Sequence, residues 1–140
     1  MEVDFAFLAE AAEAVNGKFF VIGGGFDTIW TKQVPVSYPK MSFVLRVIFD
    51  AAEVGRNHKL EIKIMDEDGG KFATIGGDIG TGNKSPNLPK GWKQGFLTVL
   101  NFVGLQFLKF GDYTFHIVVN NSTLKSVPFR VAQQIQLPTS

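Results

Sequence analysis

Apolar and polar residues alternate along most of this chain, with the period of two that is typical of half-buried β-strands. Residues 113–119 show it most clearly, because Tyr, Phe, Ile and Val take every second position there. The alanine-rich run at 9–14 favours a helix locally but is too short to form one alone. The pattern predicts about eight strands, at residues 2–12, 18–22, 41–50, 60–64, 72–79, 94–107, 113–119 and 124–131.

Segment 41–50 departs from simple alternation because both of its faces are apolar. Phe43 and Leu45 point to one side, and Val44 and Ile48 point to the other. A strand of this kind is usually covered on both sides. We therefore expect it at the centre of a sheet, with its second face partly covered.

Turn signals separate the expected strands. Asn16-Gly17 is the dipeptide of a two-residue hairpin, so the strands on either side of it should pair antiparallel. Gly23–Gly25 should end the second of these strands, and residues 33–40, which hold two prolines, should form an extended connection or an edge. Asn120-Asn121 marks another turn. The loop 76–91 is long for a compact domain, and loops of that length are often functional.

Short strands divided by frequent turns are typical of sandwiches and small barrels. The segment Phe110–Phe115 favours a sandwich, because its tyrosine stands at the entry to a late strand. In immunoglobulin-like domains the hydroxyl of such a tyrosine bonds back to the preceding corner. We predict one all-β domain over residues 1–132, an antiparallel, immunoglobulin-like two-sheet β-sandwich of about seven to nine strands, followed by a polar tail at 133–140.

Composition narrows the function classes. The chain has 140 residues and no cysteine, which excludes disulfide and cysteine–metal frameworks and fits a reducing compartment. Its 14 basic and 13 acidic residues give a net charge of +1, so no nucleic-acid partner is expected. Glu2 and Asp4 are unlike the start of a secretory signal, and no apolar run is long enough to span a bilayer. We expect a cytoplasmic protein without a membrane span or a cofactor.

Neither histidine stands in a catalytic pattern. His116 falls within an expected strand, on the face opposite Tyr113 and Phe115, and we interpret it as a solvated or inter-strand residue. His58 falls in the expected loop 51–58, where we expect it at the surface. Two histidines without cysteine do not favour a zinc site either. The sequence therefore assigns no catalytic residue.

The acidic run Asp66, Glu67 and Asp68 is a weak candidate for a metal site. Calcium binds clustered carboxylate oxygens, and a neighbouring loop of a sandwich can complete such a site. The run lacks the spacing of an EF-hand loop, and Gly69 and Gly70 follow it. The favoured interpretation is a hairpin turn, in which Asp and Gly serve the backbone conformation.

A second candidate for ligand binding is the long loop with its flank. Lys84 and Lys90 are basic and Trp92 follows them, a combination that can bind single-stranded nucleic acid or sugars. Two lysines are a small basis, so an ordinary loop is the favoured interpretation. The glycines at 23–25 do not form a phosphate loop, because neither a lysine nor a helix follows them. They favour a bulge or a close approach of backbones.

Two segments of the chain resemble a known family. They are Ile22–Trp30, with Gly24, Gly25, Phe26, Asp27 and Trp30, and Gly111–Phe115. Together they resemble a bacterial family of small uncharacterised proteins, a domain of unknown function. Its members carry a Gly-Gly-Phe-x-x-x-Trp-like segment, a central apolar strand and an Asp-Glu-Asp-Gly turn. The resemblance covers nearly the whole chain. It implies a β-sandwich and no known activity, so it assigns no functional residue.

Because the sequence sets up no reactive group, it predicts a non-enzymatic module that binds a protein partner or another copy of itself. The two-sided apolar strand at 41–50 and the 14 phenylalanines offer more apolar surface than one core needs. Two alternatives stay open. One is a sandwich that binds lipid or carbohydrate with the help of calcium at Asp66–Asp68. The other, less favoured, is a hydrolase with paired acids.

Overall fold

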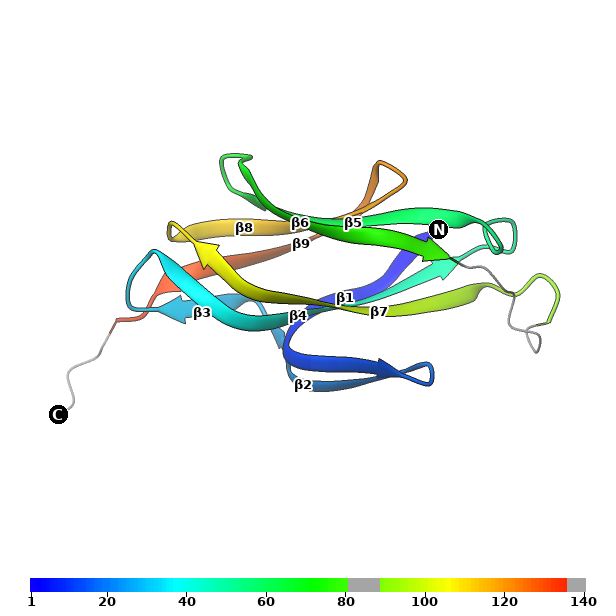
Figure 1. Ribbon diagram of the computed structural model, residues 1–140, viewed down its shortest axis with the longest axis horizontal. Helices are drawn as coiled ribbons and strands as arrows, with labels where there is room; N and C mark the ends of the chain where they lie inside the picture. Colours follow the sequence, from blue (N-terminus) through cyan, green and yellow to red (C-terminus); the bar gives the residue numbers. More distant parts are fainter. Residues whose placement is uncertain (81–88, 136–140) are drawn as a thin grey trace.

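The computed structural model describes residues 1–80 and 89–135, which form nine strands and no helix. The strands are β1 (Glu2–Val15), β2 (Lys18–Phe26), β3 (Thr28–Thr31), β4 (Val36–Phe49), β5 (Asn57–Asp66), β6 (Lys71–Gly80), β7 (Gln94–Phe107), β8 (Gly111–Val119) and β9 (Ser122–Gln133). They build two sheets that pack face to face, with the orders β2-β1-β4-β7 and β3-β9-β8-β5-β6 (Figure 1). Neighbouring strands are antiparallel except β3 and β9, which are parallel. The predicted β-sandwich is confirmed.

The sandwich has immunoglobulin-like strand order. In such domains strands A, B and E lie side by side in one sheet and C, F and G in the other, and here β1-β4-β7 faces β5-β8-β9 in the same way. The hydroxyl of Tyr113 donates a hydrogen bond of 2.7 Å to the backbone carbonyl of Lys109 at the corner before β8. This is the tyrosine contact that the segment Phe110–Phe115 predicts.

Aromatic rings fill the space between the sheets. Phe43 of β4 stacks on Phe115 of β8 with 5.1 Å between ring centroids, and Phe102 of β7 meets Phe115 edge-on at 5.7 Å. Phe129 of β9 tilts against Phe115 at 4.8 Å. All four rings are buried. A fully buried phenylalanine stabilises a fold by about 1.5–3 kcal/mol relative to an exposed one, so this cluster joins the two sheets firmly.

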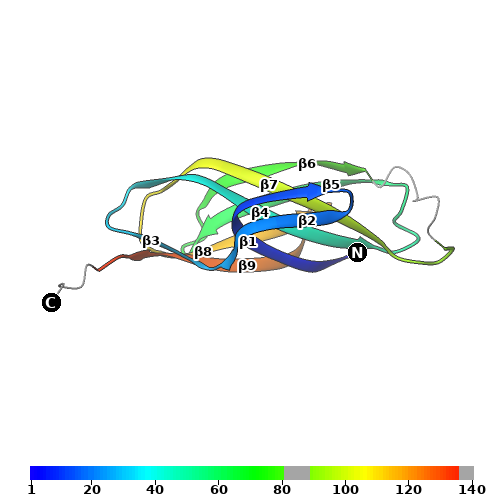
Figure 2. The same ribbon diagram turned by 90° about the horizontal axis from the view of Figure 1, so that it is seen from below.

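Strand β1 takes part in two layers of the molecule. Its first half pairs with β4, and its second half pairs with β2. At Leu8 and Ala9 the register against β2 shifts. From there the second half of β1 and its partner β2 fold back across the outer face of β4 and β7 (Figures 1 and 2). We call the folded-back unit, residues 10–26, the ribbon. Its turn is Asn16-Gly17, with φ angles of 51° and 74°, as the sequence predicts.

The ribbon covers the second face of β4. Phe19 of the ribbon meets Phe5 of the first half of β1 edge-on, with 5.7 Å between ring centroids. Phe5 and Phe7 lie opposite Arg46 and Val44 in the pairing of β1 with β4, and therefore on the outer face of the sheet. Val44 is wholly buried although it points away from the core. The predicted cover of the two-sided strand is thus confirmed, and the chain itself provides it.

The sequence misplaces several strand boundaries. The first strand runs to Val15 rather than to residue 12, because pairing with β2 overrides the helix preference of the alanines. The second strand continues through Gly23–Gly25 to Phe26. β4 begins at Val36, inside the expected connection, because its first residues pair with β7. The short strand β3 is not predicted at all, since it is defined by its long-range pairing with β9.

Candidate functional site

The acidic run lies in the hairpin between β5 and β6. The Oδ1 atom of Asp66 accepts hydrogen bonds from the backbone N–H groups of Asp68, at 3.0 Å, and Gly70, at 2.8 Å. Gly69 takes a φ of 82°, which suits glycine. The carboxylate thus holds the turn together. The pKa of Asp66 is lowered, first by the hydrogen bond from Gly70 and further by the ammonium group of Lys109.

Lys109, from the loop between β7 and β8, places its own charge among these carboxylates. Its Nζ atom lies 2.5 Å from Oδ2 of Asp68 and 3.5 Å from Oδ2 of Asp66. The hydrogen bond to Asp68 is the main cause that raises the pKa of Lys109. Glu67 packs instead against Gly111, where an added Cβ would lie 2.7 Å from Oε1 of Glu67. Within residues 1–80 and 89–135, no group of three or more His, Asp or Glu residues forms a metal-binding cluster.

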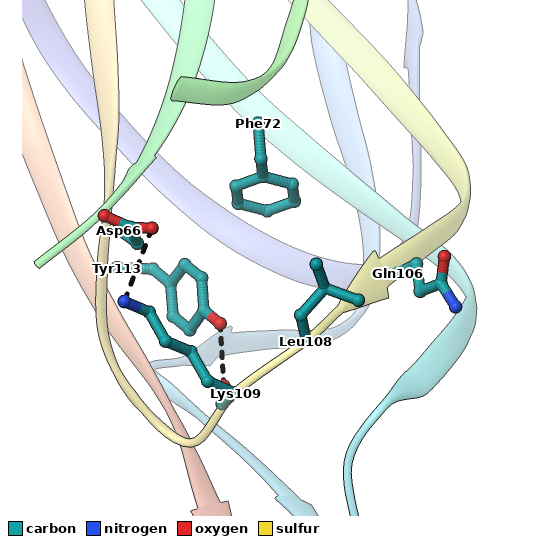
Figure 3. Close-up of a pocket in the computed structure, with 6 residues that line it drawn as sticks. All are labelled: Asp66, Phe72, Gln106, Leu108, Lys109 and Tyr113. Carbon is teal, nitrogen blue, oxygen red and sulfur yellow. Dashed lines mark hydrogen bonds and ion pairs between the residues drawn. The ribbon is translucent and has the colours of Figure 1, made fainter. Parts of the chain in front are cut away.

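A hollow of about 260 Å³ opens beside this ion pair. Figure 3 shows Phe72 and Leu108 on opposite sides of the opening, with Asp66, Lys109 and Tyr113 along one wall. Burial raises the pKa of Tyr113, whose hydroxyl is bonded to the carbonyl of Lys109. Asp66, Lys109 and Tyr113 are therefore bonded to one another. The rest of the lining is Phe72, Leu108 and Gln106, which do not form the paired nucleophile and base that covalent catalysis needs.

The candidate binding loop is only partly described. Lys84 lies outside the described residues. Lys90 is exposed, and Trp92 is 61% exposed with its backbone N–H donating to the carbonyl of Pro89 at 3.2 Å. These three residues stay a predicted binding loop.

His58 is buried, so its expected place at the surface is wrong. It belongs to β5, is 6% exposed and stacks on Phe49 with 5.1 Å between ring centroids. Its Nδ1 atom lies 3.0 Å from Nδ2 of Asn120, and its Nε2 atom lies 3.1 Å from the carbonyl of Glu53. Both ring nitrogens thus have partners, and the role is structural. The inter-strand placement of His116 holds: Nδ1 lies 2.8 Å from Oγ of Ser126 on β9.

The family-like segment guides the ribbon back into the sandwich. Gly23 and Gly25 take φ angles of 63° and 88°, and Gly24 lies against Phe7, whose Cε2 atom would be 3.2 Å from an added Cβ. Oδ1 of Asp27 accepts from the hydroxyl of Thr28 at 2.9 Å. The backbone carbonyl of Asp27 accepts from the N–H of Arg130, which leads the chain into β3.

The ribbon exposes large apolar side chains. Phe20 is 59% exposed and Ile22 is 70% exposed, both on the face opposite Phe19, while Val21 on the other face is 38% exposed. The exposed pair borders a shallow hollow of about 370 Å³, whose lining residues are Ala11, Ala12, Glu13, Phe20, Ile22 and Lys40. Sequence reasoning missed this surface. The available signal was the run of four apolar residues at 19–22 after a hairpin turn. A ribbon that packs on one sheet buries only one of its faces, so apolar residues on its other face stay exposed.

The outer edge of β2 has no partner strand in the described part of the chain. Proteins usually protect such edges with charges, prolines or irregular backbone. The first part of β4, which does not pair with β1, carries Pro39, and opposite it β7 is interrupted by Gly104, which has a φ of 68°. The edge strand β6 begins with the charged residue Lys71. In β2 only Lys18 is charged, and residues 19–22 have no such protection. This edge is therefore open to pairing with another strand.

Comparison with known families decides the classification. A family model described as "Family of unknown function (DUF6941)" matches residues 4–132. The chain belongs to this family. Membership in DUF6941 agrees with the resemblance to a domain of unknown function and assigns no activity. No curated protein matches the chain.

Among solved structures, the DUF6941 chain is similar to a β-glucuronidase from glycoside hydrolase family 2. The identity is 18% and the TM-score is 0.34, over 68% of this chain and 10% of the other. The chain thus spans about a tenth of that enzyme's length, and a likeness this distant says nothing about activity. In the ranges that the structure describes, no helix is long and apolar enough to cross a membrane.

Proposed function

We propose that this protein is a non-enzymatic assembly module, in which β2 of one copy pairs antiparallel with β2 of a second copy. The observation that carries the proposal is the unpaired edge of β2, along which Phe20, Val21 and Ile22 are exposed on both faces of the ribbon. A strand added at this edge would give the free backbone groups partners and would cover side chains above and below.

A second copy fits this edge because the pairing is self-complementary. A two-fold axis perpendicular to the ribbon keeps equivalent faces together, so the same patch serves both copies. With the axis at Val21, Phe20 of one copy lies opposite Ile22 of the other, and the two Val21 side chains meet on the inner face. Apolar cross-strand pairs of this kind each contribute about 0.2–1 kcal/mol.

Charge also favours antiparallel pairing. In the same register Lys18 of one copy lies opposite Gly24 of the other, so the two lysines stand at opposite ends of the paired segment. A parallel arrangement would set the two ammonium groups side by side, which is unfavourable. The paired surface is small, so we expect a weak, reversible dimer rather than an obligate one.

Sedimentation equilibrium of the full chain tests the proposal. We expect a monomer–dimer equilibrium that shifts toward monomer in Phe20→Lys, because the new charge would be placed among apolar side chains. Val103→Lys is the matched control, since Val103 is 78% exposed on the edge strand β7. A strictly monomeric wild-type protein at high concentration, or equal loss of dimer in both variants, would refute the proposal.

We further propose a cytoplasmic setting and a protein partner rather than a nucleic acid. The chain has no cysteine, and its charge is nearly balanced at +1. An assembly module needs neither a cofactor nor a reactive side chain. The calcium-assisted binder is the less favoured function, because Lys109 already neutralises the carboxylates of Asp66 and Asp68.

A further inference from the structure

A second groove lies where the ribbon returns to the sandwich. Its volume is about 490 Å³, and its lining residues come from four strands: Glu10 of β1, Gly23, Gly24 and Phe26 of β2, Thr28, Ile29 and Trp30 of β3, and Tyr38 of β4. None of these residues lines the hollow beside Phe20 and Ile22. The two hollows thus share no lining residue, although Gly24 of the groove lies opposite Lys18 in the register that we propose for self-association.

Aromatic side chains form much of this groove. Ile29 is 4% exposed and anchors β3 to the core, so the neighbouring Trp30 points outward and is 64% exposed. Phe26 and Tyr38 are half-buried. The pKa of Tyr38 is raised, first by burial and then by the nearby carboxylate of Glu10. An exposed indole beside other rings offers π-faces on which cations and guanidinium planes stack.

Glu10 supplies the charge of the groove. It is the one charged residue in the lining, and it forms no ion pair with any residue in the described part of the chain. An added Cβ at Gly23 would lie 2.8 Å from Cγ of Glu10, so the Glu10 side chain lies across the backbone of Gly23. The carboxylate thus lies at the groove without an ion-pair partner among the described residues, and its complement is a cation.

We propose that the groove binds a basic side chain, an arginine or a lysine of an extended peptide. Its charge lies beside Glu10 and its apolar stem lies against the rings of Trp30 and Phe26. A neutral sugar is the less favoured occupant, because it brings no charge to complement Glu10, and the hydroxyl of Thr28 already donates to Asp27.

The test uses the full chain with Trp92→Phe, which leaves Trp30 as the single tryptophan, since the sequence has two. The probe is acetyl-Gly-Arg-Gly-amide, and the matched probe replaces arginine by citrulline, which has nearly the same shape and no charge. We expect the arginine peptide to change Trp30 fluorescence in a saturable way, with millimolar affinity that weakens as salt is added. The citrulline peptide should bind at least about threefold more weakly.

Glu10→Gln should lower the affinity for the arginine peptide about threefold to tenfold while leaving the circular dichroism spectrum unchanged. At protein concentrations where the wild-type chain is monomeric, Phe20→Lys should leave this affinity unchanged, because Phe20 does not line the groove, so the groove and the dimer surface are tested separately. Equal binding of the arginine and citrulline peptides would overturn the proposal. So would a fluorescence change with methyl glucoside that Glu10→Gln does not alter, or no saturable change with the arginine peptide.

Discussion

The ring of Phe19 meets the ring of Phe5 edge-on, with 5.7 Å between their centroids. Phe5 belongs to the part of β1 that pairs with β4, and Phe19 belongs to the ribbon. Phe7 stacks beside Phe5 at 6.0 Å, and its Cε2 atom would lie 3.2 Å from a Cβ added at Gly24. The contact between Phe5 and Phe19 holds the ribbon as a third layer over the outer face of the two-layer sandwich. The strand edge that results is the basis of the proposed assembly.

Phe19→Ala should release the ribbon from the sheet while the sandwich stays folded. Because Phe19 is half-buried, we expect a loss of about 1–2 kcal/mol in the free energy of unfolding, less than the 3–5 kcal/mol of a core phenylalanine. Urea unfolding measures this loss. Phe20→Ala is the control at protein concentrations where the chain is monomeric, since Phe20 is 59% exposed and its loss should cost less than about 0.5 kcal/mol. Equal losses in the two variants would contradict the fold-back.

Tyr113→Phe should destabilise the sandwich by about 1 kcal/mol, because it removes the 2.7 Å hydrogen bond to the carbonyl of Lys109 and leaves that acceptor without it. Thermal unfolding in denaturant series measures the change. Tyr38→Phe is the matched control, because no hydrogen bond of its hydroxyl occurs among the described residues. A change no larger than the control's would show that the corner is held by packing alone.

The stability of the protein should depend on Asp66 at acid pH. Its pKa in the folded state is below that of the unfolded chain, so its contribution is present above about pH 4 and is lost as pH falls through the folded pKa. Asp66→Asn should therefore flatten the fall of the melting temperature between about pH 5 and pH 2. An unchanged slope in this variant would mean that other carboxylates control the acid response.

Millimolar calcium should leave the melting temperature of the wild-type protein unchanged. The ammonium group of Lys109 lies between the carboxylates of Asp66 and Asp68, where a cation would have to bind. Lys109→Ala removes this charge, so any calcium response should appear in that variant first. A calcium-dependent rise in the wild-type protein would instead favour the calcium-assisted binder, because a ligand selective for the folded state stabilises it.

Local sequence patterns predict the elements whose side chains alternate between core and solvent. Tyr113, Phe115 and Ile117 are buried on the predicted face of β8, and the turns at Asn16-Gly17 and Asn120-Asn121 take the positive φ angles that such dipeptides favour. These features depend on neighbours within a few residues. The short strand β3 depends on a parallel partner at the other end of the chain and leaves no comparable local signal.

The candidate sites depend on tertiary contacts and were harder to predict. The two-sided apolar strand at 41–50 indicated a cover, but only the contact between Phe5 and Phe19 shows that the chain covers itself. The acidic turn was identified, whereas Lys109 was not, because the two segments meet only through the fold. The exposed surface therefore lies on the ribbon rather than on β4.

Hydrogen exchange of the β2 amides at several protein concentrations tests the central claim most directly. Pairing of β2 with β2 gives partners to backbone N–H groups along its outer edge, and exchange of such groups slows when they are hydrogen-bonded. We predict that outward-facing amides between Lys18 and Ile22 become protected as concentration rises, and that Phe20→Lys abolishes this change. Protection of these amides that does not vary with concentration would contradict the assembly of this protein through its ribbon.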